Sequence, residues 1–497
     1  MTKILKSFPI VILITLIIQF CGLLKSVFLS KEFGASNELD AFYLANILTV
    51  SIFSVITAAI STVLIPNMVD KKKTSQSTTN YMKVLFFISV LLSLIVVVFL
   101  FLFRDLINPN FSEDINKLFF QMILILVISQ FFRIASSFYL SLLQTDNEYI
   151  LSRFPNIIPA ILPILYLLIG KNINMEILVI VIFCSYFLEM IVYYFVAKHK
   201  DKSNLTWVKP EPIPFRQDSE AKSMLRNTLP IIAGSAVFQL QILIINYLAG
   251  FFGSGMITIL SNTNQIVGIF QGLLISNVFA LVYPNIVRAV KNSLNEGKKR
   301  IENYIYLTNT LVIMVVWGYA SVGKDLVYLL FYRGNFSKDS ADFIYMFGLI
   351  LIMGLPFSVI RDYFYRFYYA IDNTSKPTAN TFLTVVFNLL CLFILQFFMG
   401  EFSLVLSTSL GTIISLFSII KKLNKDEYRF DYRNLAISYI VLNAFGFCLF
   451  LITKFLGITS DNYLLNLAIN SFIFIICFTG VLFLFRKRVL VFLKSIR

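Results

Sequence analysis

This sequence has few charged residues, a single histidine and no nucleotide-binding loop. Each of these shortages excludes a class of protein. Only 14% of the 497 residues are charged, too few to coat the surface of a soluble globule of this length. The one histidine, His199, excludes a histidine-dependent catalytic dyad and most metal sites. Neither a Walker-type loop nor a glycine-rich dinucleotide turn is present. We therefore expect no enzymatic activity, no cofactor, no metal and no bound nucleotide.

Cysteine is also sparse, and the five cysteines lie singly in apolar segments. None of them has the spacing of a redox or metal motif, so we expect each to act as a small apolar side chain. Near the N-terminus, Lys3 and Lys6 precede a long apolar run that has no small-residue cleavage site. We therefore interpret this run as a retained first span and not as a signal peptide.

Long hydrophobic runs dominate what is present. Hydrophobic residues make up 58% of the chain, and the mean hydropathy is +0.80, values typical of an integral membrane protein. A helix of about 20 apolar residues crosses the bilayer core. Such runs lie at 8–29, 41–65, 81–103, 118–142, 154–170, 176–197, 228–251, 256–283, 303–322, 341–360, 378–399, 403–420, 436–456 and 464–485. The predicted fold is all-α, with about 14 transmembrane helices.

Basic residues predict which side of the membrane each loop faces. If the N-terminus lies inside, the inner segments carry most of the basic clusters, namely Lys71–Lys73, Lys198 with Lys200 and Lys202, Lys298–Arg300, Lys421 with Lys422, and Arg486–Arg488. Both termini are therefore predicted to be cytoplasmic. This sidedness accounts for the net charge of +15, so anionic lipids are the expected partners and nucleic acid is not.

The second half of the sequence repeats the first at an offset of roughly 220 residues, which is too long for a solenoid repeat. The matched segments are Phe33–Ser36 with Phe252–Gly255, Pro66–Val69 with Pro284–Val287, Arg104–Leu106 with Lys324–Leu326, Phe111–Ser112 with Phe336–Ser337, Phe138–Tyr139 with Phe367–Tyr368, and Asp146–Asn147 with Asp372–Asn373. Six spans return the chain to its starting side, so the halves are predicted to be parallel repeats. Duplicated halves of this kind point to transport.

These repeats predict four regions. An N-lobe of six helices covers 1–197, a cytoplasmic linker covers 198–226, and a C-lobe of six helices covers 227–420. The last two helices and a basic cytoplasmic tail occupy 421–497. Alternating prolines at 210, 212 and 214 disfavour a continuous helix in the linker.

Ionisable side chains inside the spans are candidates for function, because charge at membrane depth is costly. Gln19 and Lys25 lie in the first predicted span, where Lys25 either snorkels to the outer headgroups or faces a cavity. Arg133 lies roughly 22 Å from the outer edge of the fourth span. Glu189 lies at a similar depth in the sixth span. It either neutralises Arg133 in a structural pair or meets a coupling ion or substrate charge.

Amide side chains are dense in the seventh and eighth predicted spans, and each unpaired amide in hydrocarbon costs several kcal/mol. Asn262, Asn264 and Gln271 lie in the eighth span, with Asn264 and Gln271 on one helix face. The two spans are therefore expected to line a wet cavity. Candidate substrate contacts elsewhere are Asp40 and Asn46 at the outer end of the second span, and Arg366 at the inner end of the tenth.

Several of these segments resemble a known family. Phe33–Ser36 with Asp40–Phe42, the run Leu329–Phe336, and Arg366–Ala370 with Lys376–Thr378 are similar to motifs of the MurJ/MviN lipid II flippases. That family lies in the superfamily that also holds MATE exporters and Wzx-type polysaccharide flippases, and the resemblance runs along essentially the whole chain. It implies two six-helix lobes around a cationic cavity and a lipid groove at the last two helices.

The resemblance also implies a function. The family moves an undecaprenyl-pyrophosphate-linked saccharide from the inner to the outer leaflet of the bacterial cytoplasmic membrane, where cations would bind the pyrophosphate. No nucleotide site is present, so membrane potential or a Na⁺ or H⁺ gradient is the expected energy source. Among the family's cavity charges, only Lys25 is kept. Gln19, Phe53 or Ser54, and Ser261–Asn264 stand where the family carries charged residues.

These departures leave the cargo open between lipid II and a polysaccharide repeat unit. A MATE-type ion-coupled drug exporter, with Glu189 as its exchanging carboxylate, is the alternative from another class. A third hypothesis is a scaffold that does not transport and that binds envelope-synthesis enzymes.

Overall fold

The computed structural model describes residues 2–70, 75–102, 111–145, 148–170, 173–200, 218–371, 373–457, 460 and 462–484. Every regular element within these ranges is helical. Ten of the described helical stretches are long and apolar enough to cross a membrane, and two shorter apolar helices are Phe154–Ile169 and Tyr463–Thr479. The predicted all-α membrane fold is confirmed. The count of fourteen spans and the parallel repeat layout stay predictions.

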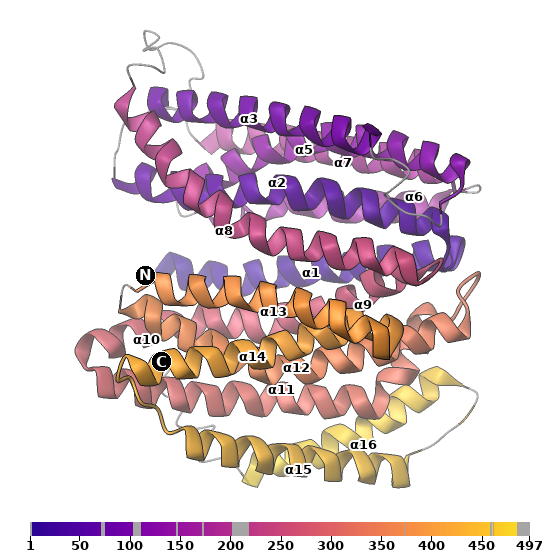
Figure 1. Ribbon diagram of the computed structural model, residues 1–497, viewed down its shortest axis with the longest axis vertical. Coiled ribbons are helices and arrows are strands. Elements are labelled where there is room, and N and C mark those ends of the chain that lie inside the picture. The colour runs from indigo at the N-terminus through magenta and orange to yellow at the C-terminus, as the bar shows by residue number, and fades with distance from the viewer. Residues whose placement is uncertain are drawn as a thin grey trace. The chain divides into compact units, whose positions relative to one another are not determined.

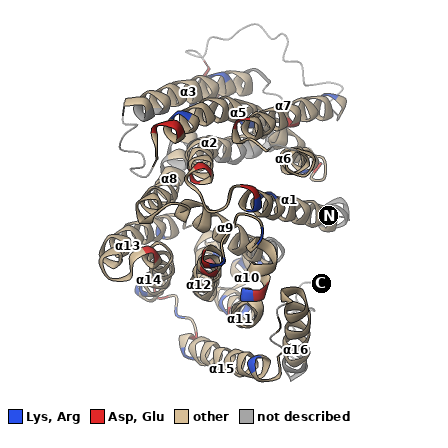
Figure 2. Cartoon of the chain, turned by 90° about the vertical axis from the view of Figure 1, so that its right-hand side faces the viewer, with Lys and Arg blue, Asp and Glu red and all other residues tan. Residues whose placement is uncertain are grey.

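The chain divides into two compact units, unit 1 (Met1–Thr258) and unit 2 (Ile259–Arg497). Figure 1 labels their helices, and Figure 2 shows that charged residues are sparse along the helices of both. Both units expose many large apolar side chains, such as Phe87 at 68% and Phe397 at 80%. Lipid is the natural solvent for such surfaces.

Unit 1 is a bundle in which α2 packs on α5, α5 packs on α7, and α1 packs on α6. Its last long helix, α8, packs against α2 and α3. The helices of this unit are α1 (Thr2–Phe33), α2 (Asn37–Asp70), α3 (Ser75–Leu102), α5 (Glu113–Thr145), α6 (Ile157–Ile169), α7 (Met175–Lys200) and α8 (Ser219–Ala249), with short 3₁₀ turns η1 (Phe154–Asn156) and η3 (Gly250–Phe252).

The start of α8 is fixed by Asp218, the N-cap residue. Its carboxylate accepts hydrogen bonds from the backbone N–H of Ala221 (2.9 Å), from Ser77 (3.0 Å) and from Asn80 (2.9 Å). Burial raises the pKa of Asp218, but these hydrogen bonds outweigh that effect and hold the pKa below its usual range. Asp218 therefore satisfies free N–H groups of α8 and ties this helix to α3.

The linker predicted at 198–226 begins and ends within described helices. Residues 198–200 belong to α7, and residues 219–226 belong to α8. Residues 201–217 lie outside the described residues, as do the basic clusters at 71–73 and 486–488 and the repeat segments at 104–106, 146–147 and 372. The compact units divide after Thr258, one helix later than the predicted lobes, because α8 packs on α2 and α3. The four-region division stays a prediction.

Unit 2 is built around α11, which packs on α10, α12, α15 and α16, while α13 and α14 pack on each other and α14 packs on α12. The α15 and α16 pair lies along α11 (Figure 1). The helices of this unit are α9 (Met256–Phe270), whose first three residues still belong to unit 1, α10 (Asn277–Asn292), α11 (Leu294–Phe331), α12 (Lys338–Ala370), α13 (Ser375–Met399), α14 (Ser403–Lys425), α15 (Tyr432–Leu456) and α16 (Tyr463–Leu484), with a π-helical turn η4 (Gln271–Ser276) and a 3₁₀ turn η5 (Gly400–Phe402).

The close approach of α15 to α11 depends on Gly446. A Cβ atom at this position would lie 2.0 Å from the Trp317 ring, so only glycine fits. Trp317 Nε1 donates a hydrogen bond to Asn443 Oδ1 on α15 (3.2 Å), which satisfies the indole N–H inside the interface. Sequence spacing alone does not reveal this contact.

The run Leu329–Phe336 ends α11 and starts α12. Gly334 adopts φ +60°, a left-handed conformation that favours glycine. Phe331 and Phe336 are buried with their ring centroids 6.0 Å apart. Ser337 then caps α12 by accepting a hydrogen bond from the Ser340 N–H (3.1 Å). The family-like motif is therefore a compact turn between two helices.

The second family-like motif fixes the turn between α12 and α13. Tyr368 donates a hydrogen bond to Asp426 (2.9 Å), and Lys376 forms an ion pair with the same carboxylate (3.2 Å). Burial raises the pKa of Asp426, but the Tyr368 and Lys376 contacts outweigh it and hold the pKa low. Both ends of the turn are thus bound to the segment that follows α14.

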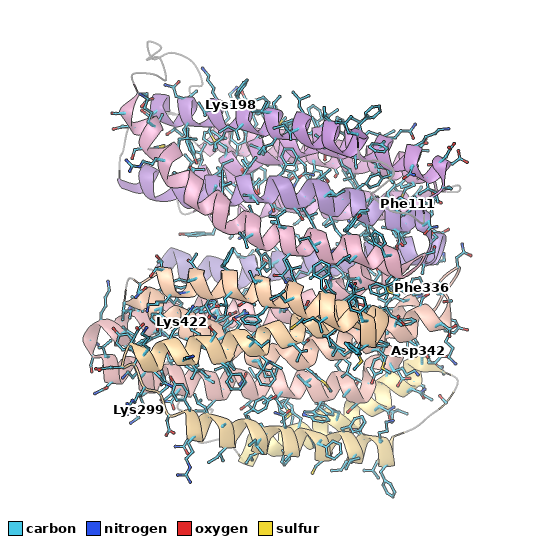
Figure 3. All side chains as sticks on the ribbon, in the orientation of Figure 1. Phe111, Lys198, Lys299, Phe336, Asp342 and Lys422 are labelled. Carbon is cyan, nitrogen blue, oxygen red and sulfur yellow. The ribbon has the colours of Figure 1, made fainter. Side chains whose placement is uncertain are left out.

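The predicted inner and outer residues separate along the helices within each unit. In unit 2, Lys299 and Lys422 lie at one end of the helices, and Phe336 and Asp342 lie at the other (Figure 3). In unit 1, Lys198 and Phe111 likewise lie at opposite ends (Figure 3). This arrangement is what two membrane faces require, although the side on which the termini lie stays a prediction.

Candidate functional site

Two cations face each other inside unit 1 and form what we call the basic pair, Lys25 and Arg133. Lys25 lies on α1 and Arg133 on α5, and both are partly buried. They lie within electrostatic range and repel one another. Neither belongs to an ion pair of 4.0 Å or less among the described residues. Like charges in a low-dielectric interior are costly unless an anion lies between them.

The Arg133 guanidinium is held by two neutral neighbours. It donates a hydrogen bond to Gln130 Oε1 one turn earlier on α5 (3.1 Å), and its Cζ lies 5.1 Å from the centroid of the Tyr186 ring on α7. A cation over an aromatic face is stabilised by roughly 0.5–2 kcal/mol. These contacts orient the guanidinium and leave most of its charge uncompensated.

Glu189 lies on α7 one turn beyond Tyr186 and is only 6% exposed. Its carboxylate and Arg133 attract each other electrostatically. Within the described part of the chain, however, no ion pair of 4.0 Å or less joins them, and no side chain or backbone N–H donates a hydrogen bond to the carboxylate of Glu189. The helices α5 and α7 that carry Arg133 and Glu189 pack against each other. It is a long-range attraction, not a closed ion pair.

Asp40 is fully engaged by the chain itself. The carboxylate is 1% exposed. It accepts hydrogen bonds from the Gly255 N–H, the Thr258 N–H and the Thr258 hydroxyl, each at 2.7 Å. These donors belong to the first turn of α9, where backbone N–H groups lack helical partners and the helix dipole favours an anion. We call this set of contacts the Asp40 clasp.

The clasp joins the two repeated turns found in the sequence. Gly255 in the second turn adopts φ +86°, and a Cβ there would lie 2.6 Å from the carbonyl oxygen of Ala35 in the first turn. The Phe33–Ser36 and Phe252–Gly255 segments therefore pack directly against each other. Glycine is required at 255 for both its conformation and this close approach.

In unit 2, the charged residues near the end of α12 are paired locally. Arg361 forms an ion pair with Asp362 (2.8 Å) and lies over the Tyr365 ring (5.4 Å). Arg366 lies 3.5 Å above the centroid of Phe279 on α10 and donates to the Asp362 carbonyl (3.1 Å). The candidate Arg366 is thus placed against an aromatic ring, and one of its five N–H groups is bound to a backbone carbonyl.

The amide candidates divide between two environments. Asn262 is fully buried, whereas Asn264 and Gln271 are exposed. Gln271 begins the π-helical turn η4, where the helical period changes, and such turns are often found at functional sites. Gln19 and Asn46 are partly buried on α1 and α2. Their role as substrate contacts stays a prediction.

Comparison with known proteins decides the family. A family model described as "Lipid II flippase MurJ" matches residues 29–478, most of the chain. The chain belongs to the MurJ family. The resemblance inferred from the sequence motifs is thereby confirmed.

Individual MurJ relatives are distant. The chain is 26% identical over 449 residues to a "Probable lipid II flippase MurJ" of Buchnera aphidicola subsp. Baizongia pistaciae (strain Bp), a match that covers 86% of this chain and 84% of that one. It is 26% identical over 237 residues to a protein of the same description from Aquifex aeolicus (strain VF5). In that second match the chain spans only 45% of the relative's length.

Solved structures show the same fold. A structure titled "Lipid II flippase MurJ, inward closed conformation" superposes with a TM-score of 0.77 at 17% identity, covering 96% of this chain and 99% of that one. An inward-facing multidrug resistance MATE family transporter of the MOP superfamily gives a TM-score of 0.61 at 14% identity, covering 80% and 92%. These superpositions show that the chain shares its fold with both structures.

Two features of this MurJ-family chain escaped the sequence reasoning. Tyr186 and Gln130 contact Arg133. In the sequence, Tyr186 is one of many aromatic residues in apolar segments, and only the packing of α5 on α7 shows that it lies beside Arg133. Thr258 completes the Asp40 clasp from 218 residues away. The repeated turns around residues 34 and 254 were the signal that could have found this contact.

Proposed function

We propose that this protein is a flippase for an undecaprenyl-pyrophosphate-linked saccharide, with lipid II as the favoured cargo. Two observations support the proposal. Membership of the MurJ family points to lipid II. The basic pair, two cations without a close carboxylate, supplies the chemistry that a pyrophosphate needs. The cargo would travel from the inner to the outer leaflet of the bacterial cytoplasmic membrane.

The basic pair is the observation that carries the substrate class. A pyrophosphate placed between Lys25 and Arg133 would replace their mutual repulsion by two attractions. Each hydrogen bond to a charged group contributes about 1.5–3 kcal/mol. The lipid tail need not enter the protein, because the helices expose many large apolar side chains, such as Phe87 and Phe397.

Alternating access would open the protein first to one side and then to the other. The Asp40 clasp supports this mechanism, because hydrogen bonds from one carboxylate join two turns. A clasp of this kind can close in one state and release in another. Membrane potential would bias the two states by about 2.3 kcal/mol per charge per 100 mV.

The basic loops support an orientation with both termini in the cytoplasm. Lys299 and Lys422 lie at the same end of unit 2, and each lies in a run of basic residues (Figure 3). Anionic headgroups of the inner leaflet would be attracted to these residues. Envelope-synthesis enzymes would meet the protein at this membrane, since they make and consume its proposed cargo.

The test is complementation in cells depleted of their own flippase. The full chain is expressed, and the saccharide headgroup accessible at the outer leaflet is measured with a reagent that cannot cross the membrane. Lipid II should become accessible and growth should recover. If only a polysaccharide repeat unit becomes accessible, the cargo is the other lipid-linked saccharide; if neither does, the proposal fails.

A drug exporter of the MATE type is the second candidate, favoured by the buried carboxyl of Glu189. Such an exporter exchanges a cation at a buried acid. Expression in a drug-sensitive host discriminates between the two functions. Resistance that Glu189→Gln abolishes would support the exporter, whereas unchanged susceptibility together with lipid transport would support the flippase.

A further inference from the structure

Glu189 is a buried acid that the proposed function leaves without a role. It lies on α7, 6% exposed, on the side that packs against α5. Two turns of α7 bring together Tyr186, Glu189 and Tyr193, since residues three and four apart share a helix face. The Tyr193 hydroxyl lies 2.7 Å from the Ser152 carbonyl oxygen and 2.7 Å from Asn156 Oδ1, and its proton is directed at these two acceptors. The hydroxyl therefore does not donate a hydrogen bond to Glu189.

The groups that face Glu189 can be named element by element. From α5 comes Arg133, and from α7 itself come Tyr186 and Tyr193. The helix α6 has no charged residue. The turn η1 offers the amide Asn156, which Tyr193 occupies, and its N-cap residue Arg153 acts electrostatically on Tyr193. Lys25 on α1 acts on this group through Arg133, which it repels. Among the described groups, Arg133 is thus the cation that Glu189 can pair with.

A buried carboxylate without a hydrogen-bond donor or a close cation is strongly disfavoured. The carboxyl can avoid that cost in two ways. It can carry a proton, as the present arrangement with Arg133 over Tyr186 requires. Alternatively, it can ionise once the guanidinium leaves the Tyr186 ring and pairs with it. One cation therefore has three competing partners: an aromatic ring, an acid, and the anionic headgroup of the proposed cargo.

We propose that Glu189 is a proton-binding site that positions Arg133. While Glu189 holds its proton, Arg133 stays over Tyr186 and is available to a diphosphate. When the headgroup has left, Glu189 releases its proton to solvent and captures Arg133 as an ion pair. No bond other than the carboxyl O–H is broken, and the proton is the only species exchanged. The inference rests on the proposed function and adds a coupling ion to it.

The sign of the pH dependence follows from this competition. At low pH the carboxyl is protonated, and Arg133 is free to bind the diphosphate. As the pH rises and the proton is lost, the ion pair forms and the affinity for the diphosphate falls. Glu189 therefore links headgroup binding to proton uptake. A purely structural acid would not produce this linkage.

The closing experiment measures binding of undecaprenyl pyrophosphate to the full chain in lipid nanodiscs between about pH 6 and about pH 8. The diphosphate itself ionises over this range, so the slope is read against Glu189→Gln, which cannot release a proton. The matched control is Glu176→Gln, which changes an exposed acid in the first turn of the same helix. We expect the wild-type affinity to fall about tenfold relative to Glu189→Gln, and Glu176→Gln to follow the wild type.

Two further measurements separate the possible failures. The infrared band of a protonated carboxyl, followed against pH without ligand, should be present in the wild type and absent in Glu189→Gln. Tyr186→Leu removes the ring that competes for Arg133, so this band should disappear at a lower pH. A lipid that fails to bind at any pH would overturn the proposed function, while an unchanged band in Glu189→Gln would overturn the proton site. Equal slopes for the wild type and Glu189→Gln would also overturn it.

Discussion

The two units of this protein treat their intramembrane cations differently. In unit 2, Arg361 is paired with Asp362 at 2.8 Å, and Arg366 lies against Phe279 and donates to the Asp362 carbonyl. In unit 1, Lys25 and Arg133 repel each other, and the nearest acid, Glu189, stays beyond ion-pair distance. Paired cations stabilise the fold, whereas unpaired ones are available for an anionic ligand. The contrast between the paired Arg361 and the unpaired Lys25 and Arg133 favours unit 1 for the proposed headgroup site.

Removing either member of the basic pair should have the largest effect. Lys25→Ala or Arg133→Ala would delete a charged contact worth about 1.5–3 kcal/mol, which corresponds to a loss of roughly tenfold to a hundredfold in headgroup transport. This loss is measured as the accessibility of the lipid headgroup at the outer leaflet in cells depleted of their own flippase. Lys291→Ala, which removes an exposed cation at the end of α10, is the control. Full transport by both variants would show that the unpaired cations of unit 1 do not bind the headgroup, and the proposed difference between the two units would be wrong.

Breaking the pair in unit 2 should act on stability. Asp362→Ala leaves Arg361 partly buried without its carboxylate, and we expect the free energy of unfolding to fall by about 1–3 kcal/mol. Thermal unfolding in detergent measures this loss. Headgroup affinity of the folded fraction should be unchanged, and a large fall in that affinity would mean that unit 2 also contributes cations to the site.

Asp218, the N-cap residue of α8, has a carboxylate that is stabilised by hydrogen bonds and not by a cation. Asp218→Ala should lower stability at neutral pH by about 1–2 kcal/mol. The pKa of Asp218 is lower in the folded chain, so its contribution is present at neutral pH and is lost as the pH falls through the folded value, below about pH 4. Unfolding midpoints of the wild type and the variant should therefore converge in acid. A constant difference down to pH 3 would contradict this assignment.

The smallest effect is expected at an exposed pair. Glu296 and Arg300 form an i,i+4 ion pair at 3.2 Å on α11, with side chains 45% and 34% exposed. Glu296→Gln should change the free energy of unfolding by no more than about 0.5 kcal/mol. The same thermal assay, with salt added to screen the pair, checks this limit. A loss comparable to that of Asp362→Ala would show that exposure does not separate the two classes of pair.

Much of the fold was predictable from the sequence, because hydrophobic length alone marks membrane helices. Most predicted spans overlap a single described helix, down to the short α6, whereas the span predicted at 256–283 is divided among α9, η4 and α10. The repeated turns around Gly34 and Gly253 were also recognised, since glycine with positive φ leaves a visible signature. The π-helical turn at Gln271 was not predicted, because its hydrogen bonds have no distinct sequence pattern.

The site was predicted less well than the fold. Lys25, Arg133 and Glu189 were singled out because charge in a span is rare, which needs no knowledge of packing. Their partners were not found. Tyr186 depends on how α5 and α7 rotate about their axes, and the hydrogen bonds of Asp40 depend on a turn more than 200 residues away. The spacing of residues in a sequence does not show which way a side chain points or which distant residues it contacts.

The most direct test is the affinity of undecaprenyl pyrophosphate for the full chain in nanodiscs, with and without the basic pair. The variant Lys25→Gln/Arg133→Gln should bind at least about a hundredfold more weakly than the wild type, while Lys291→Gln binds normally. An unchanged affinity in the double variant, with normal folding, would contradict the assignment of the headgroup site to unit 1.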